Sequence, residues 1–166
     1  MGFFRNGSLF NKTPAPAASP PGSPVLASST AAAGKATTKR RGDAAEALAL
    51  GHLQRQGLRL VRRNFKTPGR GGGEVDLIMR ETDGTLVFVE VRQRAGASRG
   101  GAGGSITAIK QQRIILAARH FLLQLGSEPP CRFDVVLVEG ALAPDGSAPG
   151  ARVEWLRAAF DASATF

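Results

Sequence analysis

Two acidic residues of this sequence stand on neighbouring β-rich runs, at positions where their side chains can meet. Asp76 lies in EVDLIMR and Glu90 in TLVFVEVRQR, on either side of Thr82-Asp83-Gly84, which is typical of a hairpin turn. A three-residue loop, with Gly84 in the left-handed conformation, places Asp76 directly opposite Glu90. A two-residue loop would put the two side chains on opposite faces. The chemistry therefore depends on the register of one hairpin.

Carboxylates facing each other across two strands favour a bound cation. Like charges about 5 Å apart destabilise a sheet unless something lies between them. Glu74 shares the strand face of Asp76, and the three carboxylates Glu74, Asp76 and Glu90 suit a hard divalent ion with oxygen ligands, Mg²⁺ or Mn²⁺. Such an ion stabilises charge on a phosphoryl oxygen and lowers the pKa of a bound water. The alternative is a surface hairpin whose acids are solvated or paired with nearby arginines.

Basic residues surround these acids in the sequence. The 166-residue chain has 22 Lys and Arg against 13 Asp and Glu, a net charge of +9, which favours a polyanionic partner. Nucleic acid is the first expectation and an anionic membrane surface the second. Phosphate contacts with counterion release are expected from the basic residues near the acids, namely Arg62, Arg63, Lys66, Arg70, Arg94 and Arg99.

The sequence also predicts where the protein works. No apolar run approaches the roughly 20 residues that span a bilayer, and the N-terminal region lacks the apolar core of a secretory signal. Cys131 is the single cysteine, so an internal disulfide is excluded. We expect a soluble protein of the cytoplasm, without a membrane partner.

Two parts of different composition make up the chain. Residues 1–38 are rich in Pro, Ala and Ser and cannot bury enough apolar surface to offset the entropy of ordering, so they are predicted to form a disordered tail. Residues 39–166 are predicted to form one domain. Within it, Ala45, Ala49 and Leu53 recur at helical spacing in a first helix over 39–56.

The remaining elements must hold the acids in place. Three strands over 58–65, 74–80 and 85–94 precede a helix over 108–125, a buried strand over 133–139 and an edge strand at 153–156. The helical crossover favours parallel pairing of the strands on either side of it. The expected fold class is α/β, a central mixed β-sheet flanked by helices, in the order α-β-β-β-α-β-β.

These motifs together resemble the YraN family of bacterial proteins. The likeness spans about residues 39 to 160 and rests on four segments, KRRGDAAEALALGHLQRQGLRLVRRNF, GGGEVDLIMRETDGTLVFVEVRQR, GGSITAIKQQRI and CRFDVVLVEG. That family is similar to the restriction-endonuclease-like superfamily, whose signature is an Asp followed by Glu-x-Lys on the next strand. It also resembles archaeal Holliday junction resolvases, which carry a further Glu on the first helix and work as dimers.

The resemblance implies roles for particular residues. Asp76 and Glu90 become metal ligands, Glu46 becomes the carboxylate of the first helix, and Arg92 takes the place of the signature lysine. Arginine binds phosphate in a forked geometry but stays protonated, so it cannot act as a general base or acid. Lys110 could substitute, because with Thr107 as the N-cap it stands in the first turn of the second helix, where the helix dipole disfavours a cation.

Three functions are consistent with this pattern. The first is a metal-dependent endonuclease that acts on DNA, including branched or recombination and repair intermediates, as a homodimer. The second is a nucleic-acid-binding module that keeps the nuclease fold without turnover, since Arg92 replaces the lysine. The third is a small structural or interaction protein in which the acidic hairpin only stabilises the fold.

Overall fold

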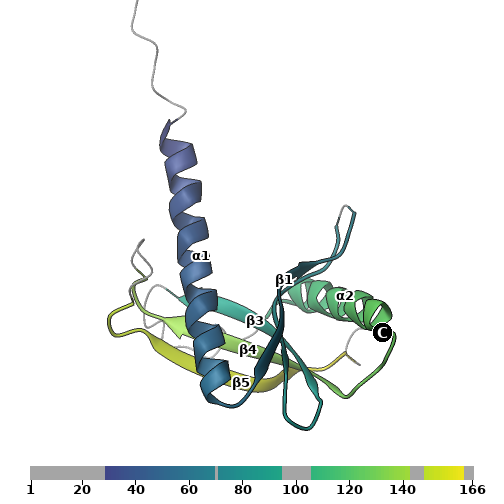
Figure 1. Ribbon diagram of the computed structural model, residues 1–166. Coiled ribbons are helices and arrows are strands. Elements are labelled where there is room, and N and C mark those ends of the chain that lie inside the picture. The colour runs from purple at the N-terminus through teal and green to yellow at the C-terminus, as the bar shows by residue number, and fades with distance from the viewer. Residues whose placement is uncertain (1–28, 70, 95–105, 143–147, 163–166) are drawn as a thin grey trace, which may run out of the picture.

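One mixed sheet and two helices make up the described part of the protein (Figure 1). The computed structural model describes residues 29–69, 71–94, 106–142 and 148–162, with side chains from residue 38 onward. The elements follow the expected order α-β-β-β-α-β-β, which confirms the α/β class. They are α1 (Ser29–Arg55), β1 (Arg59–Lys66), β2 (Glu74–Arg80), β3 (Leu86–Arg94), α2 (Ala108–Leu125), β4 (Cys131–Glu139) and β5 (Arg152–Phe160).

The five strands lie in the sheet in chain order, β1-β2-β3-β4-β5. Neighbouring strands are antiparallel except β3 and β4, which pair in parallel from Leu86↔Cys131 to Arg94↔Glu139. A parallel pair needs a long crossover, and α2 supplies it, as predicted. β3 is buried from Leu86 to Glu90 and β4 from Phe133 to Val138, whereas the edge strands β1 and β5 are largely exposed. The edge strand expected at 153–156 is longer than predicted, since β5 continues to Phe160.

Each face of the sheet is covered by one helix, so the fold has three layers (Figure 1). Ala45, Ala49 and Leu53 of α1 are buried against one face in a core shared with alternate residues of β2, β3 and β4. Ile114 and Ala117 of α2 are buried against the other face, in a core rich in phenylalanine. The sheet residues between the helices are covered on both faces, which is why parts of the central strands are continuous apolar runs in the sequence.

Helix α1 begins at Ser29, ten residues before the helix predicted from the sequence. The segment from Ser29 to Thr38 therefore is helical, although composition placed it in a disordered tail. Its alanines have high helix propensity and need no apolar partner to form a helix next to an anchored one. The rest of that predicted tail, residues 1–28, lies outside the described residues.

Gly73 lets the loop before β2 lie directly against α2. A Cβ atom at this position would stand 2.2 Å from the carbonyl oxygen of Arg113 and 2.5 Å from the amide nitrogen of Ala117. Gly73 N–H also donates a 2.7 Å hydrogen bond to the Thr67 hydroxyl, which closes the loop. The close approach fixes α2 over the start of β2.

Within the described residues, no helix is long and apolar enough to cross a membrane.

Candidate carboxylate site

The hairpin between β2 and β3 has the three-residue loop on which the sequence argument depended. Glu81 N–H donates to the Thr85 carbonyl at 2.9 Å, and Gly84 N–H donates to the Glu81 carbonyl at 3.1 Å. Gly84 has φ +94°, a backbone conformation that favours glycine. The strand pairs then run from Arg80↔Leu86 to Leu77↔Val89. The next position in this register brings Asp76 to Glu90.

The two strands separate at Asp76 and Glu90. A regular ladder would bond the Val91 N–H to the Val75 carbonyl, but this N–H donates to Asp76 Oδ2 at 2.8 Å. Val75 packs in the core beneath α2 while Leu77 packs in the core beneath α1, so the strict alternation of faces does not continue through Asp76. The Asp76 carboxylate thus ends the ladder and is held by a backbone amide.

Glu90 is the more buried of these acids, with an exposed fraction of 7%. Burial, followed by the charge of Asp76, raises the pKa of Glu90 to about 8, against the opposing effect of Lys110. Its Oε2 atom is buried and has no partner with hydrogen-bond geometry within the described part of the chain. The nearest cation, the Lys110 ammonium, lies 3.1 Å from this oxygen without hydrogen-bond geometry, so the burial of Glu90 is costly.

Glu46 reaches the same region from α1. Burial, and then the charge of Asp76, raises the pKa of Glu46, while a hydrogen bond from Asn64 and the charge of Arg63 act in the opposite direction. Arg63 Nη2 lies 3.9 Å from Glu46 Oε2, too far for a hydrogen bond, and this oxygen has no such partner among the described residues. We call Glu46, Asp76 and Glu90 the carboxylate cluster.

Lys110 enters the site from the first turn of α2. The Thr107 hydroxyl caps this helix by accepting the Lys110 N–H at 3.3 Å, as the sequence predicted. Lys110 Nζ lies 3.1 Å from both Glu74 Oε1 and Glu90 Oε2. Burial alone would lower the pKa of Lys110, but Glu90 and Glu74 outweigh it and raise the pKa, so the ammonium stays charged. Glu74 therefore joins the site through Lys110, and this hydrogen bond lowers the pKa of Glu74.

An open depression of about 390 Å³ lies beside Glu90. Arg92 forms part of its wall and has no ion-pair partner among the residues that the structure describes. A free guanidinium and the Lys110 ammonium thus line one hollow next to a buried acid. The lining residues are Glu90, Val91, Arg92, Gln93, Thr107 and Lys110.

The basic residues predicted to bind nucleic acid fall into three groups. Arg62 on β1 is exposed and has no ion-pair partner in the described ranges. Three others face acids, since Arg63 lies near Glu46, Lys66 lies 3.4 Å from Glu74, and Arg94 lies 3.7 Å from Glu139. Arg70 and Arg99 lie outside the described residues.

The donors fit a hard divalent ion that keeps part of its water shell. Within the described ranges, no group of three or more His, Cys, Asp or Glu side chains is arranged as a ready-made metal site. The site instead offers buried carboxylate oxygens on Glu46 and Glu90 without hydrogen-bond partners, beside Asp76. Mg²⁺ is commonly bound by one or two carboxylates and several waters, so this donor set is sufficient for it.

Two features of the site and its surroundings were not found from the sequence. Asn64 adopts a positive φ of 49° on β1, and its side chain hydrogen-bonds Glu46. The sequence around it, two arginines and a phenylalanine, only weakly indicates this backbone conformation or this contact. Asp134 is fully buried and bonds Arg132 and Trp155. A charged residue inside an apolar strand was the available signal, and it indicated only a turn.

Fold and site together define the class of protein: a three-layer α/β protein with a buried acidic site where two strands of its mixed sheet separate. The chain belongs to the uncharacterised protein family UPF0102, the YraN family of the sequence resemblance, whose model matches residues 45–138. That match spans every member of the carboxylate cluster.

Proteins of this family from several bacteria are similar to the chain over most of its length. A UPF0102 protein of Polaromonas naphthalenivorans is 66% identical over 127 residues, which cover 76% of this chain and 82% of that protein. One from Polaromonas sp. strain JS666 is 63% identical over 135 residues, or 81% and 90% of the two chains. One from Methylibium petroleiphilum is 53% identical over 130 residues, or 76% and 98%.

Proposed function

We propose that the protein is a cytoplasmic, metal-dependent endonuclease that acts on DNA, with branched or repair intermediates as the first substrates to test. The observation that carries this proposal is the carboxylate cluster. Two of its three acids have buried oxygens without hydrogen-bond partners and raised pKa values. Acids in this state cost stability, and such groups gather at functional sites.

Asp76 and Glu90 are the residues that would hold Mg²⁺ or Mn²⁺, with Glu46 and Glu74 beside them. When bound, the ion supplies charge stabilisation at a phosphoryl oxygen and a water of lowered pKa. Asp76 is oriented for this role by the Val91 amide. Glu90 is buried next to Asp76, so a cation there would relieve the repulsion that raises its pKa.

Two cations would contact the substrate. Lys110 is held 3.1 Å from Glu90 by the cap at Thr107 and by Glu74, and its ammonium can donate a hydrogen bond to a phosphate oxygen in the depression. Arg92 lines the same hollow and can bind phosphate through two parallel N–H bonds. Neither residue supplies a general base, since Lys110 stays charged and Arg92 cannot lose its proton.

Cleavage assays test the proposal. Purified protein is incubated with four-way junction, single-stranded and linear duplex DNA, with Mg²⁺, with Mn²⁺ and with EDTA. Cleavage that requires the ion and falls at least about 100-fold in Asp76→Asn is the expected result. Glu154→Gln removes an exposed acid on β5 and serves as the matched control, with unchanged cleavage expected. Cleavage that persists in Asp76→Asn would refute the assignment.

A second function is favoured by one specific observation. Arg92 stands where the superfamily signature has lysine, and the acids do not form a preassembled metal site within the described residues. A nucleic-acid-binding module without turnover would have these properties. Binding to DNA that weakens steeply with salt, without cleavage in either metal, is the result that selects it over the endonuclease.

Likeness to the resolvases also leads us to propose a homodimer. Helix α2 presents three apolar side chains at seven-residue intervals, Ile109, Leu116 and Leu123, which are 68%, 46% and 79% exposed. A two-fold axis at Leu116 would pair Ile109 of one copy with Leu123 of the other. Light scattering should give twice the mass of the chain for the wild type and the monomer mass for Leu116→Lys. A monomeric wild type at about 50 μM would refute the dimer.

A further inference from the structure

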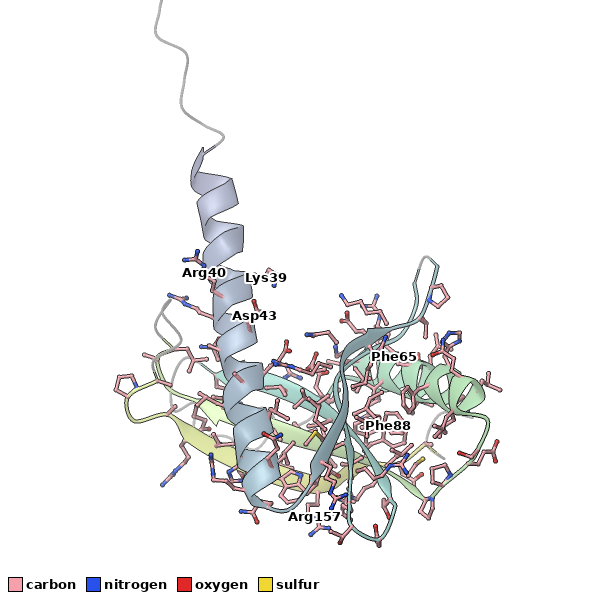
Figure 2. All side chains as sticks on the ribbon, in the orientation of Figure 1. Lys39, Arg40, Asp43, Phe65, Phe88 and Arg157 are labelled. Atoms are coloured by element: carbon pink, nitrogen blue, oxygen red, sulfur yellow. The ribbon has the colours of Figure 1, made fainter. Side chains whose placement is uncertain are left out.

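The N-terminal part of α1 stands free of the rest of the protein. Burial of α1 against the sheet begins at Ala45, and the residues before it from Thr38 to Arg41 are exposed. Figures 1 and 2 show this part of the helix projecting beyond the sheet, with Lys39 and Arg40 on it. We call residues 29–43 the basic arm. At 1.5 Å per residue it is about 22 Å long.

The composition of the basic arm limits what it can bind. It consists only of Ser, Thr, Ala, Gly, Lys, Arg and Asp, with no apolar side chain larger than alanine. A helix that pairs with another helix, or that lies in a membrane surface, needs an apolar face to bury. The arm lacks one, so hydrophobic contact cannot hold a partner there.

Charge is what the basic arm offers. Its four basic residues stand against the single acid Asp43, which gives a net +3 over 15 residues. Asp43 Oδ2 lies 2.9 Å from Lys39 Nζ, in an exposed pair of small energetic value. Arg40 and Arg41 have no ion-pair partner within the described part of the chain. A helix with two free guanidinium groups and no apolar face is suited to binding a polyanion.

The arm begins beside the carboxylate cluster. Lys39 and Glu46 are seven residues apart, so they lie on the same face of α1, about 10 Å apart along its axis. Their charges interact in the structure. Arg40 lies about 100° and Arg41 about 200° around the helix from Lys39, so the three cations spread around α1 at the end of this line. A nucleic acid whose phosphate occupies the site can therefore continue along the arm, whose length equals about six base pairs at 3.4 Å each.

We propose that the basic arm binds the DNA backbone next to the carboxylate cluster, with Lys39, Arg40 and Arg41 as phosphate contacts that set which side of the site the duplex occupies. The polyanion is taken as DNA on the strength of the proposed function. The contacts are electrostatic and independent of base sequence, because the arm carries no side chain suited to reading base edges other than these cations.

Binding measurements without metal test the arm separately from cleavage. Fluorescence anisotropy of a labelled duplex of about 25 base pairs is recorded across a salt series in EDTA. The triple variant Lys39→Gln, Arg40→Gln, Arg41→Gln should bind at least about tenfold more weakly and lower the slope of log affinity against log salt by about 2 to 3. The matched control, Arg55→Gln, Arg59→Gln, Arg152→Gln, changes charge equally at exposed sites away from the arm and should bind like the wild type.

The outcomes separate this proposal from the endonuclease. If both triple variants lose the same DNA affinity, or the arm variant loses none, the arm proposal is wrong. Cleavage that depends on Asp76 would not be affected by that result. If only the arm variant loses DNA binding and the wild type cuts no DNA, the result supports the arm and refutes the endonuclease. Arg40→Lys with Arg41→Lys should retain binding, because the charge is kept. Arm-dependent retention on anionic vesicles with unchanged DNA binding would overturn DNA as the partner.

Discussion

Two groups of buried acids in this protein have opposite environments. The first is the carboxylate cluster of Glu46, Asp76 and Glu90. The second, which we call the paired cluster, joins the base of the hairpin to β4 and β5. Its acids are bound by cations and by N–H donors on neighbouring strands, and its members are Glu81, Arg132, Asp134, Trp155 and Arg157.

Every acid of the paired cluster is satisfied. Asp134 is fully buried, and it accepts hydrogen bonds from Arg132 Nε at 2.8 Å, Trp155 Nε1 at 2.9 Å and the Ala158 amide at 2.9 Å. Arg132 also forms two bonds to Glu81, at 2.8 and 3.1 Å, and these lower the pKa of Glu81. In the carboxylate cluster, burial and the charge of Asp76 outweigh the effects of Asn64, Arg63 and Lys110, so the pKa values of Glu46 and Glu90 are raised.

This contrast distinguishes the acids that stabilise the fold from those that do not. The same sheet supplies cations and amides to one set of acids and leaves buried oxygens of the other without hydrogen-bond partners in the described residues. The paired cluster ties β2, β4 and β5 together, so its removal should weaken the fold. The carboxylate cluster costs stability, so its removal should affect function first.

The largest expected effect is in the paired cluster. Asp134→Ala leaves Arg132, Trp155 and the Ala158 amide without their common acceptor, and should lower the free energy of unfolding by about 3 to 5 kcal/mol. Asp76→Ala, its counterpart in the carboxylate cluster, should change it by less than about 1 kcal/mol. Urea denaturation followed by circular dichroism measures both. If the two variants lose equal stability, the distinction between the clusters is wrong.

Gly73→Ala should perturb the carboxylate cluster through α2. The added Cβ would overlap the Arg113 carbonyl and the Ala117 amide, so α2 must move away from β2, and Lys110 moves with it. We expect a loss of about 1 to 3 kcal/mol in the free energy of unfolding, typical of overpacking. Gly42→Ala, at a helical glycine with nothing within 4 Å of its Cβ position, is the control and should not destabilise. Thermal denaturation of both variants decides.

The pH dependence of stability should be dominated by the carboxylate cluster above pH 4.5. The pKa of Glu90 is about 8 in the folded protein and near 4.5 when unfolded, so the folded state binds this proton more tightly. Stability of the metal-free protein is then greatest below pH 4.5 and falls as the pH rises to about 8. We expect a decline on the order of 1 to 2 kcal/mol, because the Lys110 ammonium beside Glu90 favours its charged form and offsets part of the effect.

Glu90→Gln should remove most of that decline. Glutamine stays neutral across the range, while the raised pKa of Glu46 leaves a smaller slope in the same direction. The acids with lowered pKa values, Glu74 and Glu81, titrate below this window and do not contribute to it. Urea denaturation at pH 5, 6, 7 and 8 in EDTA gives the slope. A wild-type stability that rises across this range would contradict the environment assigned to Glu90.

Much of the fold could be predicted because it depends on local patterns. The bounds of β2 and α2 and the Thr107 cap follow from spacing and capping chemistry, and all are confirmed. The hairpin sequence left a three-residue and a two-residue loop open, and the structure has the three-residue loop with Gly84 at φ +94°. The start of α1 was not predictable in this way. Residues 29–38 hold no apolar residue larger than alanine, so the apolar periodicity that locates a helix is absent from them.

The site was predictable in part. Hairpin register brings Asp76 to Glu90, and the capped helix start brings Lys110 toward them. The strand pattern does not show that the ladder opens at Asp76, because there the Val91 amide bonds a side-chain carboxylate, which strand alternation does not predict. The paired cluster was missed for a similar reason. Glu81, Arg132 and Trp155 are far apart in the chain, and only the assembled sheet gives Asp134 its partners.

The smallest expected effect is at the exposed end of the paired cluster. Arg157 Nη2 lies 2.9 Å from Glu81 Oε1, and its guanidinium stacks 4.9 Å from the Trp155 ring centre, but the side chain is 56% exposed. Arg157→Gln should therefore cost less than about 1 kcal/mol, since solvent screens both contacts and Arg132 still satisfies Glu81. Urea denaturation of Arg157→Gln and Asp134→Ala compares the two losses in the free energy of unfolding. A loss as large as that of Asp134→Ala would mean that exposed charge, rather than buried pairing, holds β5 to the sheet.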